Sequence, residues 1–536
     1  MNHKLRLLTL LCLACGFFAC RKLDVPVESQ FVKGNFPVTQ ADYTALLGTM
    51  YSNLSSQYAI PYWRMQELST DEAIIPARDG NFDDGGQYRQ LHYHSWTFDH
   101  PNVIGIWQWG FGGINNCNRL ITITNSSAAS AASKASSLAE IKAMRALYYF
   151  FMLDLYGNVP VITSFPVTSS PATQARDQVF NFIETELKAV LPTLPVKTAS
   201  NAVSTYGRPT KAMAFALLEK MYLNSQVYTG KPRYTDAVTM ADSILKQGNY
   251  SLDANWFDIF GALNGPQINE TIFAVPYDQQ IPGNQFTRFG FYYYLVEYYK
   301  FRVGESIAMS TTHEFYNRFN LPGDIRTYEW LVGKQYAPGP VIPFQDLTRP
   351  AYYPNASSTT SPTQIEIFPD LVLVPPKPMD VGNSLMSQGE GIRSIKYYPD
   401  ATTIQATRLN GNDVPVFRLA DVLLMKAEAI LRGAAPTAVG NGPVQTPDYL
   451  VNLVRTRAGA PSVTGIDLPG LLDDRAREFA WEGWRRNDLI RFGQFEKDYP
   501  FPNDPLTMNK DVTRRLYPVP STELTLNPAL KQNAGY

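Results

Sequence analysis

Apolar residues recur every three or four positions along several stretches of the chain, which is the period of a helix with one buried face. The clearest run consists of Ile141, Met144, Tyr148, Phe151 and Leu155. Ser137 and Glu140 form a capping box before this run, and Gly157 follows it, where a positive φ can end a helix. The pattern therefore predicts a helix that begins near Ser137 and ends near Gly157.

The same period predicts more helices in the first half of the chain. Residues 210–228 and 234–246 form a helical pair, interrupted at Gly230 and Pro232. This pair spans about 34 residues, the size of a tetratricopeptide unit, with no clean repeat consensus. Further helices are expected near 40–55, 113–124 and 177–190.

The pattern changes between residues 255 and 415. Asn, Pro, Gly, Ser and aromatic residues dominate there, with short strand-like runs at 271–275, 371–374 and 395–398. Helical periodicity returns over 416–536, at 420–431, 449–457 and 471–492. Loops this long are usually functional. We therefore expect a mainly α fold in one compact unit, with an N-terminal helical half (20–254) and a C-terminal half (255–536). A tetratricopeptide-like helical scaffold would carry a long, loop-rich, irregular face with a few short strands.

The composition is that of a globular protein without a strong charge. The chain has 536 residues, of which 45% are hydrophobic and 18% charged, and its net charge is −1. This apolar fraction excludes wholesale disorder, and the balance of charge gives no electrostatic basis for binding nucleic acid.

The N-terminus is typical of an export signal. Lys4 and Arg6 precede a short apolar run over 7–19, and Cys20 follows Ala19. This junction resembles the cleavage site of a bacterial lipoprotein, whose new N-terminal cysteine is acylated. We therefore interpret 1–19 as a lipoprotein signal peptide and Cys20 as the lipidated residue.

Two alternatives remain for the N-terminus: cleavage before Cys15, and ordinary secretion without lipid. After cleavage at Cys20 the mature chain holds only Cys20 and Cys117. Acylation of Cys20 would leave Cys117 without a disulfide partner, so the fold must depend on its own core.

Familiar catalytic motifs are missing from the sequence. It has no phosphate-binding loop, no G-x-S-x-G nucleophile elbow and no H-E-x-x-H zinc helix. The carboxylate pairs Asp83/Asp84 and Asp473/Asp474 leave glycoside hydrolysis as an alternative, although adjacency in sequence does not place two carboxylates across a substrate. We expect no enzymatic activity.

Metal binding has two candidate segments. His92 and His94, with Asp99, have the residue types of a metal site, although packing among neighbouring aromatic residues explains them as well. The loop from Asp79 to Gln90 places oxygen ligands at the first positions of an EF-hand, but it lacks the required glycine and the final glutamate. We expect no cofactor, with a structural calcium ion as the alternative.

The residues of the same loop suit a sugar better. Flat aromatic faces beside short polar side chains match a sugar ring with its apolar face and hydroxyl rim. The predicted ligand-binding residues are Arg78, Asp79, Asn81, Asp83, Gln87, Tyr88 and Trp96, together with Tyr292, Tyr293 and Tyr294 from a second aromatic segment. Trp107 and Trp109, which follow the first segment, are expected to pack in the core.

Several motifs, in a fixed order, resemble the SusD/RagB family over nearly the whole mature chain. They are EIKAMRALYYF (140–150), LYGNVP (155–160), YGRPTK (206–211), NETIF (269–273), FRLADVLLMKAEA (417–429), VRTRAG (454–459), RAREFAWEGWR (475–485), LYPVP (516–520) and QNAGY (532–536). Ala534 departs from the family pattern, where proline is common.

The resemblance implies a surface-exposed, lipid-anchored protein of the outer membrane. It would bind an oligosaccharide and deliver it to a SusC-like TonB-dependent transporter; peptide uptake, as RagB-type members imply, is the alternative. The charged residues of the motifs should form structural ion pairs. These are Arg145, Arg418, Glu428, Arg477, Glu478 and Glu482.

Overall fold

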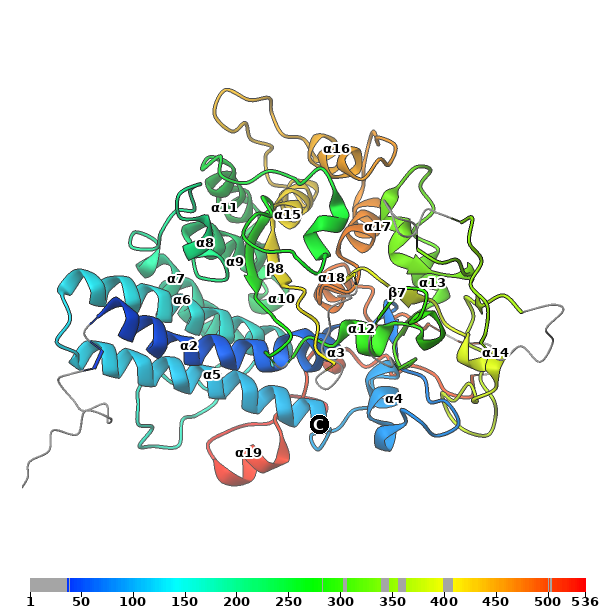
Figure 1. Ribbon diagram of the computed structural model, residues 1–536. Helices are drawn as coiled ribbons and strands as arrows, with labels where there is room; N and C mark the ends of the chain where they lie inside the picture. Colours follow the sequence, from blue (N-terminus) through cyan, green and yellow to red (C-terminus); the bar gives the residue numbers. More distant parts are fainter. Residues whose placement is uncertain are drawn as a thin grey trace, which may run out of the picture.

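A helical scaffold and a loop-rich region make up the molecule (Figure 1). The computed structural model describes residues 36–37, 39–281, 283–301, 306–338, 347–354, 363–398, 408–499, 501 and 504–536. The signal peptide and Cys20 lie outside the described residues. Within the described ranges, no helix has the length and apolar character needed to cross a membrane.

Four helices build the first part of the scaffold: α2 (Gln40–Gln57), α5 (Pro101–Ser126), α6 (Ala131–Leu155) and α7 (Arg176–Val190). α5 packs against both α2 and α6, and α6 packs against α7; α2, α5 and α6 lie side by side in Figure 1. α5 and α6 approach closely at two glycines, because a Cβ on Gly110 would collide with Met152 and one on Gly113 with Tyr148. Every residue of α6 from Met144 onward is buried.

The second part of the scaffold continues the same arrangement. Its helices are α9 (Lys211–Leu223), α10 (Ser225–Thr229), α11 (Tyr234–Leu245), α15 (Leu419–Leu431), α16 (Pro447–Arg457), α17 (Leu468–Phe479) and α18 (Arg485–Arg491). α11 packs against α9 and α15, and α15 packs against α16 and α17. The mainly α fold predicted from apolar periodicity is confirmed.

Three details of the predicted helices are wrong. α6 begins at Ala131, with Ser130 as its N-cap, so Ser137 lies inside the helix. α5 begins at Pro101 and is longer than the predicted 113–124. The segment 471–492 is two helices, because Trp481 and Gly483 have positive φ values of 61° and 82° and turn the chain between α17 and α18.

The strands are short. β2 (Thr271–Val275) is the strand predicted at 271–275. It pairs antiparallel with β8 (Val414–Arg418). The remaining pairs are β1 (Ala73–Ile74) with β3 (Ser310–Thr311), β4 (Trp330–Leu331) with β7 (Arg393–Ser394), and β5 (Gly333–Lys334) with β6 (Glu366–Ile367). The predicted strands at 371–374 and 395–398 are wrong: the first pairs with no strand of the described chain, and the pairing of β7 ends at Ser394.

Short helices connect these elements and populate the loop-rich region. The α-helical ones are α3 (Trp63–Glu67), α4 (Gln87–His92), α8 (Ala202–Thr205), α12 (Phe286–Gly290), α13 (His313–Tyr316), α14 (Leu385–Gln388) and α19 (Ser521–Leu526). The π-helix η1 (Tyr58–Tyr62) follows α2, and the 3-10 turns are η2 (Asp84–Gly86), η3 (Trp256–Phe260), η4 (Tyr293–Leu295), η5 (Ile325–Glu329) and η6 (Val512–Arg515).

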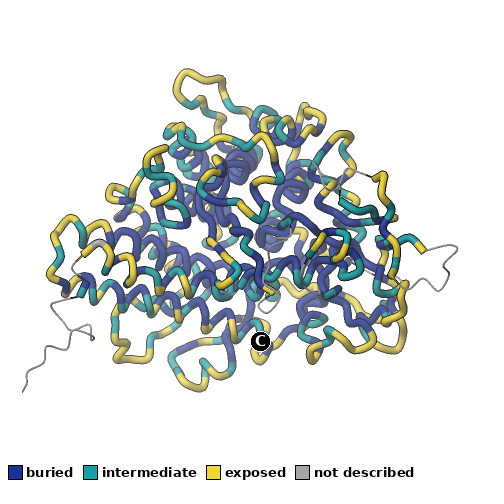
Figure 2. Tube along the Cα trace, viewed as in Figure 1, coloured by how far each residue is buried: buried dark blue, intermediate teal, exposed yellow. Residues whose placement is uncertain are grey.

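Ion pairs lie within the core as well as on the surface. The guanidinium of Arg418, fully buried, contacts the carboxylates of Glu270, Glu478 and Glu482. Arg145 pairs with Glu186, Glu428 with Arg491, and Arg477 with Asp474. The expectation that the charged motif residues form structural pairs is confirmed. Figure 2 shows the buried interior continuing from the helical scaffold into the loop-rich region.

Candidate functional site

A cluster of tyrosines lies on the loop-rich region, around η4. Tyr292 is buried, whereas Tyr293 and Tyr294 are half-buried, with ring centroids 4.1 Å apart and planes tilted by 34°. The ring of Tyr353 meets Tyr294 edge-on at 4.9 Å, and its hydroxyl lies 3.3 Å from that of Tyr292. Such contacts hold the two partly exposed rings in fixed positions, which lowers the entropic cost of binding a ligand against them.

The hydroxyl of Tyr293 donates a hydrogen bond to the side-chain oxygen of Gln388, at the end of α14. The amide nitrogen of Gln388 in turn donates to the side-chain oxygen of Asn383 at 3.0 Å. Asn383 is exposed. This places directional polar groups next to the ring of Tyr293.

The loop after β1 is anchored to the same region by Arg78 and Asp380. Arg78 is buried, and its guanidinium donates to the backbone oxygens of Ile307, Ser387 and Glu390. The carboxylate of Asp380 accepts from the backbone N–H groups of residues 79, 80 and 382. Burial opposes ionisation of Asp380, but these three hydrogen bonds outweigh it and lower its pKa.

The structure brings the two predicted segments together. Phe82, at the tip of the loop, packs against the apolar cluster that contains Tyr292, and Tyr293 and Tyr294 pack against this same cluster. Arg78 joins the loop to the last residues of α14, where Gln388 contacts Tyr293. Two segments that are more than 200 residues apart in the sequence therefore meet on one face.

Six of the predicted ligand-binding residues are exposed or partly exposed. Asp79 and Asn81 are exposed, and Asp83 and Gln87 are partly exposed, as are Tyr293 and Tyr294. Asp79 pairs with Lys377 at 2.6 Å, and Asp83 pairs with Arg89 at 2.7 Å. Their role in ligand binding stays a prediction.

The other four predicted residues are buried, so the expectation that they present a surface to a ligand is wrong. Arg78 donates to three backbone oxygens, and Tyr88 lies under the guanidinium of Arg64. Tyr292 is at the centre of its cluster. Trp96 is 1% exposed, and its ring packs 4.6 Å from that of Tyr517.

Tyr353, Gln388 and Asn383 were not predicted. They lie in the loop-rich part of the chain, where neither helical nor strand periodicity indicates which side chains share a face. The adjacent aromatic residues Tyr352 and Tyr353 were the one available signal. Trp107 and Trp109 are buried, which confirms their predicted place in the core.

The histidines expected either to bind metal or to pack are packed. His94 lies in the core beside Phe495, and one ring nitrogen is 2.8 Å from the backbone oxygen of Ser69. Burial lowers the pKa of His94 to about 4 and that of His92 to about 3. In the described part of the chain, no group of three or more His, Cys, Asp and Glu residues has the arrangement of a metal site.

Three of the four carboxylates considered for hydrolysis are engaged by arginines, and the fourth, Asp84, is exposed. Asp83 pairs with Arg89, and Asp473 pairs with Arg318 at 3.1 Å. Asp474 is buried and accepts hydrogen bonds from both Arg455 and Arg477. An acid–base pair needs two carboxyl groups facing each other across a substrate, and these side chains face arginines instead.

Two family models match the chain. Residues 373–536 match the model described as the SusD family, and residues 24–223 match the model described as starch-binding associating with outer membrane. The chain belongs to the SusD family. The starch-binding protein SusD of Bacteroides thetaiotaomicron is 26% identical over 434 residues, which cover 74% of this chain and 72% of that protein. The SusD-like protein P38 of Formosa agariphila is 24% identical over 74% of each chain.

Solved structures share the fold over almost the whole chain. The surface glycan-binding protein A of Bacteroides thetaiotaomicron, in complex with laminarihexaose, superposes with a TM-score of 0.70 at 21% identity, covering 92% of this chain and all of that one. A SusD-like carbohydrate-binding protein of Bacteroides fragilis has a TM-score of 0.71 at 18% identity, covering 92% of this chain and 99% of that one. At such identities the likeness establishes the fold.

Proposed function

We propose that this protein is a glycan-binding lipoprotein of the cell surface. Anchored through Cys20, it captures an oligosaccharide and delivers it to a SusC-like TonB-dependent transporter of the outer membrane. The observation that carries the proposal is the tilted ring pair Tyr293–Tyr294, fixed by its neighbours and partly exposed beside polar side chains. The names of the relatives, one starch-binding and one bound to laminarihexaose, support a glycan as the ligand.

The tyrosine pair and the loop supply the two kinds of contact that a sugar needs. The partly exposed faces of Tyr293 and Tyr294 can lie against the apolar face of a sugar ring. Asp79, Asn81 and Gln388 can exchange hydrogen bonds with its hydroxyl groups. None of these contacts forms or breaks a covalent bond, so the ligand should leave unchanged.

Calorimetric titration of the mature chain with oligosaccharides tests the proposal. Starch-derived and laminarin-derived oligosaccharides are the first probes, because the relatives' names include both. Binding of a glycan that is recovered intact supports the proposal. Binding of peptides with no binding of any glycan fraction would favour the alternative of peptide uptake. Steady release of reducing ends, abolished by one carboxylate substitution, would replace the binding role with hydrolysis.

Delivery to a transporter needs a separate experiment. A tagged copy of the full chain, isolated from native outer membranes in mild detergent, should retain a TonB-dependent transporter. Deletion of that transporter should stop uptake of the glycan while surface binding persists. Normal uptake in the deletion strain would contradict the delivery role without affecting the binding role.

A further inference from the structure

A cavity of about 640 Å³ lies on the helical scaffold and shares no lining residue with the tyrosine cluster or the loop after β1. We call it the α2 cavity, because one side of α2, between Thr44 and Ser56, forms its floor. Its walls come from Glu140 of α6, from the turn 206–208 before α9, and from the end of β2 with the segment that follows. Ligand pockets in proteins typically measure about 300–1,000 Å³, so the α2 cavity is large enough for a small molecule or a short oligosaccharide.

Two glycines shape the α2 cavity. Gly48 lies inside α2, and a Cβ at this position would meet nothing within 4 Å outside the backbone of its own helix. Because glycine weakens a helix interior relative to alanine, Gly48 adds open space above α2 at a cost to the helix. Gly207 has a positive φ of 65°, and a Cβ there would collide with the ring of Pro276. Glycine at this position therefore lets the turn 206–208 approach the end of β2 and close one wall of the cavity.

Arg208 supplies a donor that a ligand can reach. Its Nε atom lies 2.9 Å from one carboxylate oxygen of Glu140, and its Nη2 atom contacts the other. The side chain of Arg208 is 35% exposed, and its Nη1 atom makes no hydrogen bond within the described residues and is not sealed from solvent. The hydrogen bonds to Glu140 raise the pKa of Arg208, so the guanidinium stays charged. Because the pair as a whole is neutral, a ligand with hydroxyl groups suits it better than an ion.

Ring surface and further polar groups complete the lining. Tyr51 and Tyr206 are half-buried, and the hydroxyl of Tyr51 donates to Glu140, which holds the ring in place. Gln280 and Pro276 line the cavity and are exposed. Nine of the sixteen lining residues have a hydroxyl, amide or charged side chain. Aromatic surface beside this many directional polar groups matches a sugar, which has an apolar ring face and a rim of hydroxyls.

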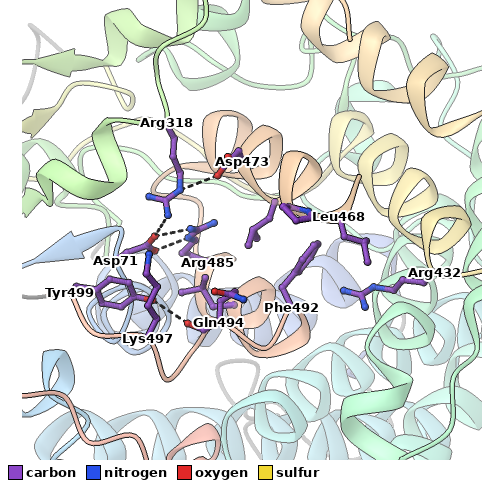
Figure 3. Close-up of a pocket in the computed structure, with 13 residues that line it drawn as sticks. Asp71, Arg318, Arg432, Leu468, Asp473, Arg485, Phe492, Gln494, Lys497 and Tyr499 are labelled. Carbon is purple, nitrogen blue, oxygen red and sulfur yellow. Dashed lines mark hydrogen bonds and ion pairs between the residues drawn. The ribbon is translucent and has the colours of Figure 1, made fainter. Parts of the chain in front are cut away.

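A smaller cavity, of about 370 Å³, lies between α17 and α18 and differs in the access to its charged groups (Figure 3). Arg485 and Arg318 both contact Asp71 there, and Arg318 also contacts Asp473. The side chain of Arg485 is only 2% exposed, so its charge serves Asp71 and not a ligand. The α2 cavity is therefore the better candidate for binding a polar molecule.

We propose that the α2 cavity is a second carbohydrate site, which binds a short neutral segment of a glycan. This inference rests on the proposed function, because it takes a glycan as the ligand of the protein. The sugar rings lie against Tyr51 and Tyr206, and their hydroxyl groups accept from Nη1 of Arg208 and exchange hydrogen bonds with Gln280. A glycan long enough to reach both this site and the tyrosine cluster is held more tightly than either site alone would hold it.

Calorimetric titration with maltotriose and laminaritriose tests this proposal, because a short sugar reports on each site separately. The mature chain with Tyr293→Ala and Tyr294→Ala should still bind one of these sugars, through the α2 cavity. Adding Gly48→Phe should weaken this remaining binding at least about tenfold, because the ring enters the open space above α2. Gly105→Phe is the matched control: Gly105 is an exposed glycine inside α5 whose Cβ would also meet nothing within 4 Å, so the affinity should stay unchanged.

The melting temperature separates a filled cavity from a misfolded chain. If Gly48→Phe lowers it more than Gly105→Phe does, Ser52→Phe takes its place, at an exposed position of the lining one turn further along α2. Two results would overturn the second site and leave the proposed function standing: loss of all trisaccharide binding in the tyrosine variant, or unchanged binding in a folded chain with a filled cavity. If the unmodified chain binds no glycan fraction at all, the proposed function fails as well.

Discussion

The indole N–H of Trp96 donates a hydrogen bond of 2.6 Å to the hydroxyl oxygen of Tyr536, the last residue of the sequence. That hydroxyl in turn donates to the backbone oxygen of Leu516 at 2.7 Å. Trp96 therefore connects the segment before α5 with the C-terminal end of the chain. Its role in this structure is to hold these two segments together.

Trp96→Phe should lower the free energy of unfolding by about 1–3 kcal/mol, because it removes the hydrogen bond and leaves a smaller ring in a buried site. Its affinity for the glycan should stay unchanged. Urea denaturation measures the first quantity and calorimetry the second. Tyr536→Phe, which removes the hydroxyl on the other side of the bond, is the matched control and should also destabilise. If Trp96→Phe loses affinity for the glycan while its free energy of unfolding stays unchanged, Trp96 is part of the ligand site.

The helices could be predicted because their signal is local. Residues three and four apart face the same neighbour, so the buried stripe of α6 is visible in one stretch of sequence. Helix ends were harder: Ser137 and Glu140 have the form of a capping box, yet Glu140 instead accepts hydrogen bonds from Tyr51 and Arg208. Both partners lie in other helices or loops, which no local pattern reveals.

The candidate site was predictable only in part, because its contacts are long-range. The sequence indicated that the loop after β1 and the tyrosines near 293 belong to one face, and the structure brings them together. It gave no indication that Trp96 packs against Tyr517 or that Gln388 contacts Tyr293. An exposed aromatic residue and a buried one have the same appearance in a loop-rich sequence.

Arg418→Met should lower the free energy of unfolding by about 3–5 kcal/mol. The substitution leaves the carboxylates of Glu270, Glu478 and Glu482 in the core without their shared partner. Lys188→Met, which breaks a pair with Glu184 at a side chain that is 52% exposed, is the control and should cost less than about 1 kcal/mol. Denaturant titration of both variants measures the difference. Equal small effects would mean that the buried network relaxes without its arginine.

Glu72 gives the fold a pH dependence. Burial raises the pKa of its carboxyl to about 8, although the backbone N–H of Trp481 donates to it and Arg485 favours its charged form. In the unfolded chain the same carboxyl titrates near about 4.3. Between these two values the folded state holds a proton that the unfolded state has released. The contribution of Glu72 to stability is therefore full below the unfolded pKa and is lost as the pH rises through the folded pKa.

Glu72→Gln should therefore gain stability relative to the unmodified chain as the pH rises from about 5 to about 9. The amide oxygen of glutamine can still accept from Trp481, and the side chain has no proton to lose. Urea denaturation at both pH values measures the change. Glu297→Gln, at an exposed position, is the control and should show no comparable gain. A stability difference that is independent of pH would mean that Glu72 is ionised in the folded chain throughout this range.

Cys20→Ala should release the mature protein from the membrane fraction, because several acyl chains on one cysteine give durable anchoring. Cell fractionation followed by detection of the chain measures the release. Cys117→Ala is the control: Cys117 is buried and free, so its loss should leave attachment unchanged. If the Cys20→Ala protein stays bound while Cys15 is intact, cleavage occurs at Cys15 and the predicted site is wrong.

Tyr293→Ala and Tyr294→Ala should each weaken glycan binding by about 1–3 kcal/mol, the range for losing an aromatic contact surface. Both rings are only partly buried, so the melting temperature should change less than in Trp96→Phe. Tyr293→Phe separates two roles of one side chain, because it keeps the ring against Tyr294 and removes only the hydroxyl that contacts Gln388. Tyr328→Ala removes an exposed tyrosine from η5 and should leave the affinity unchanged. Unchanged affinity in both Tyr293→Ala and Tyr294→Ala would exclude this cluster as the glycan site, because each change removes one of the two partly exposed rings.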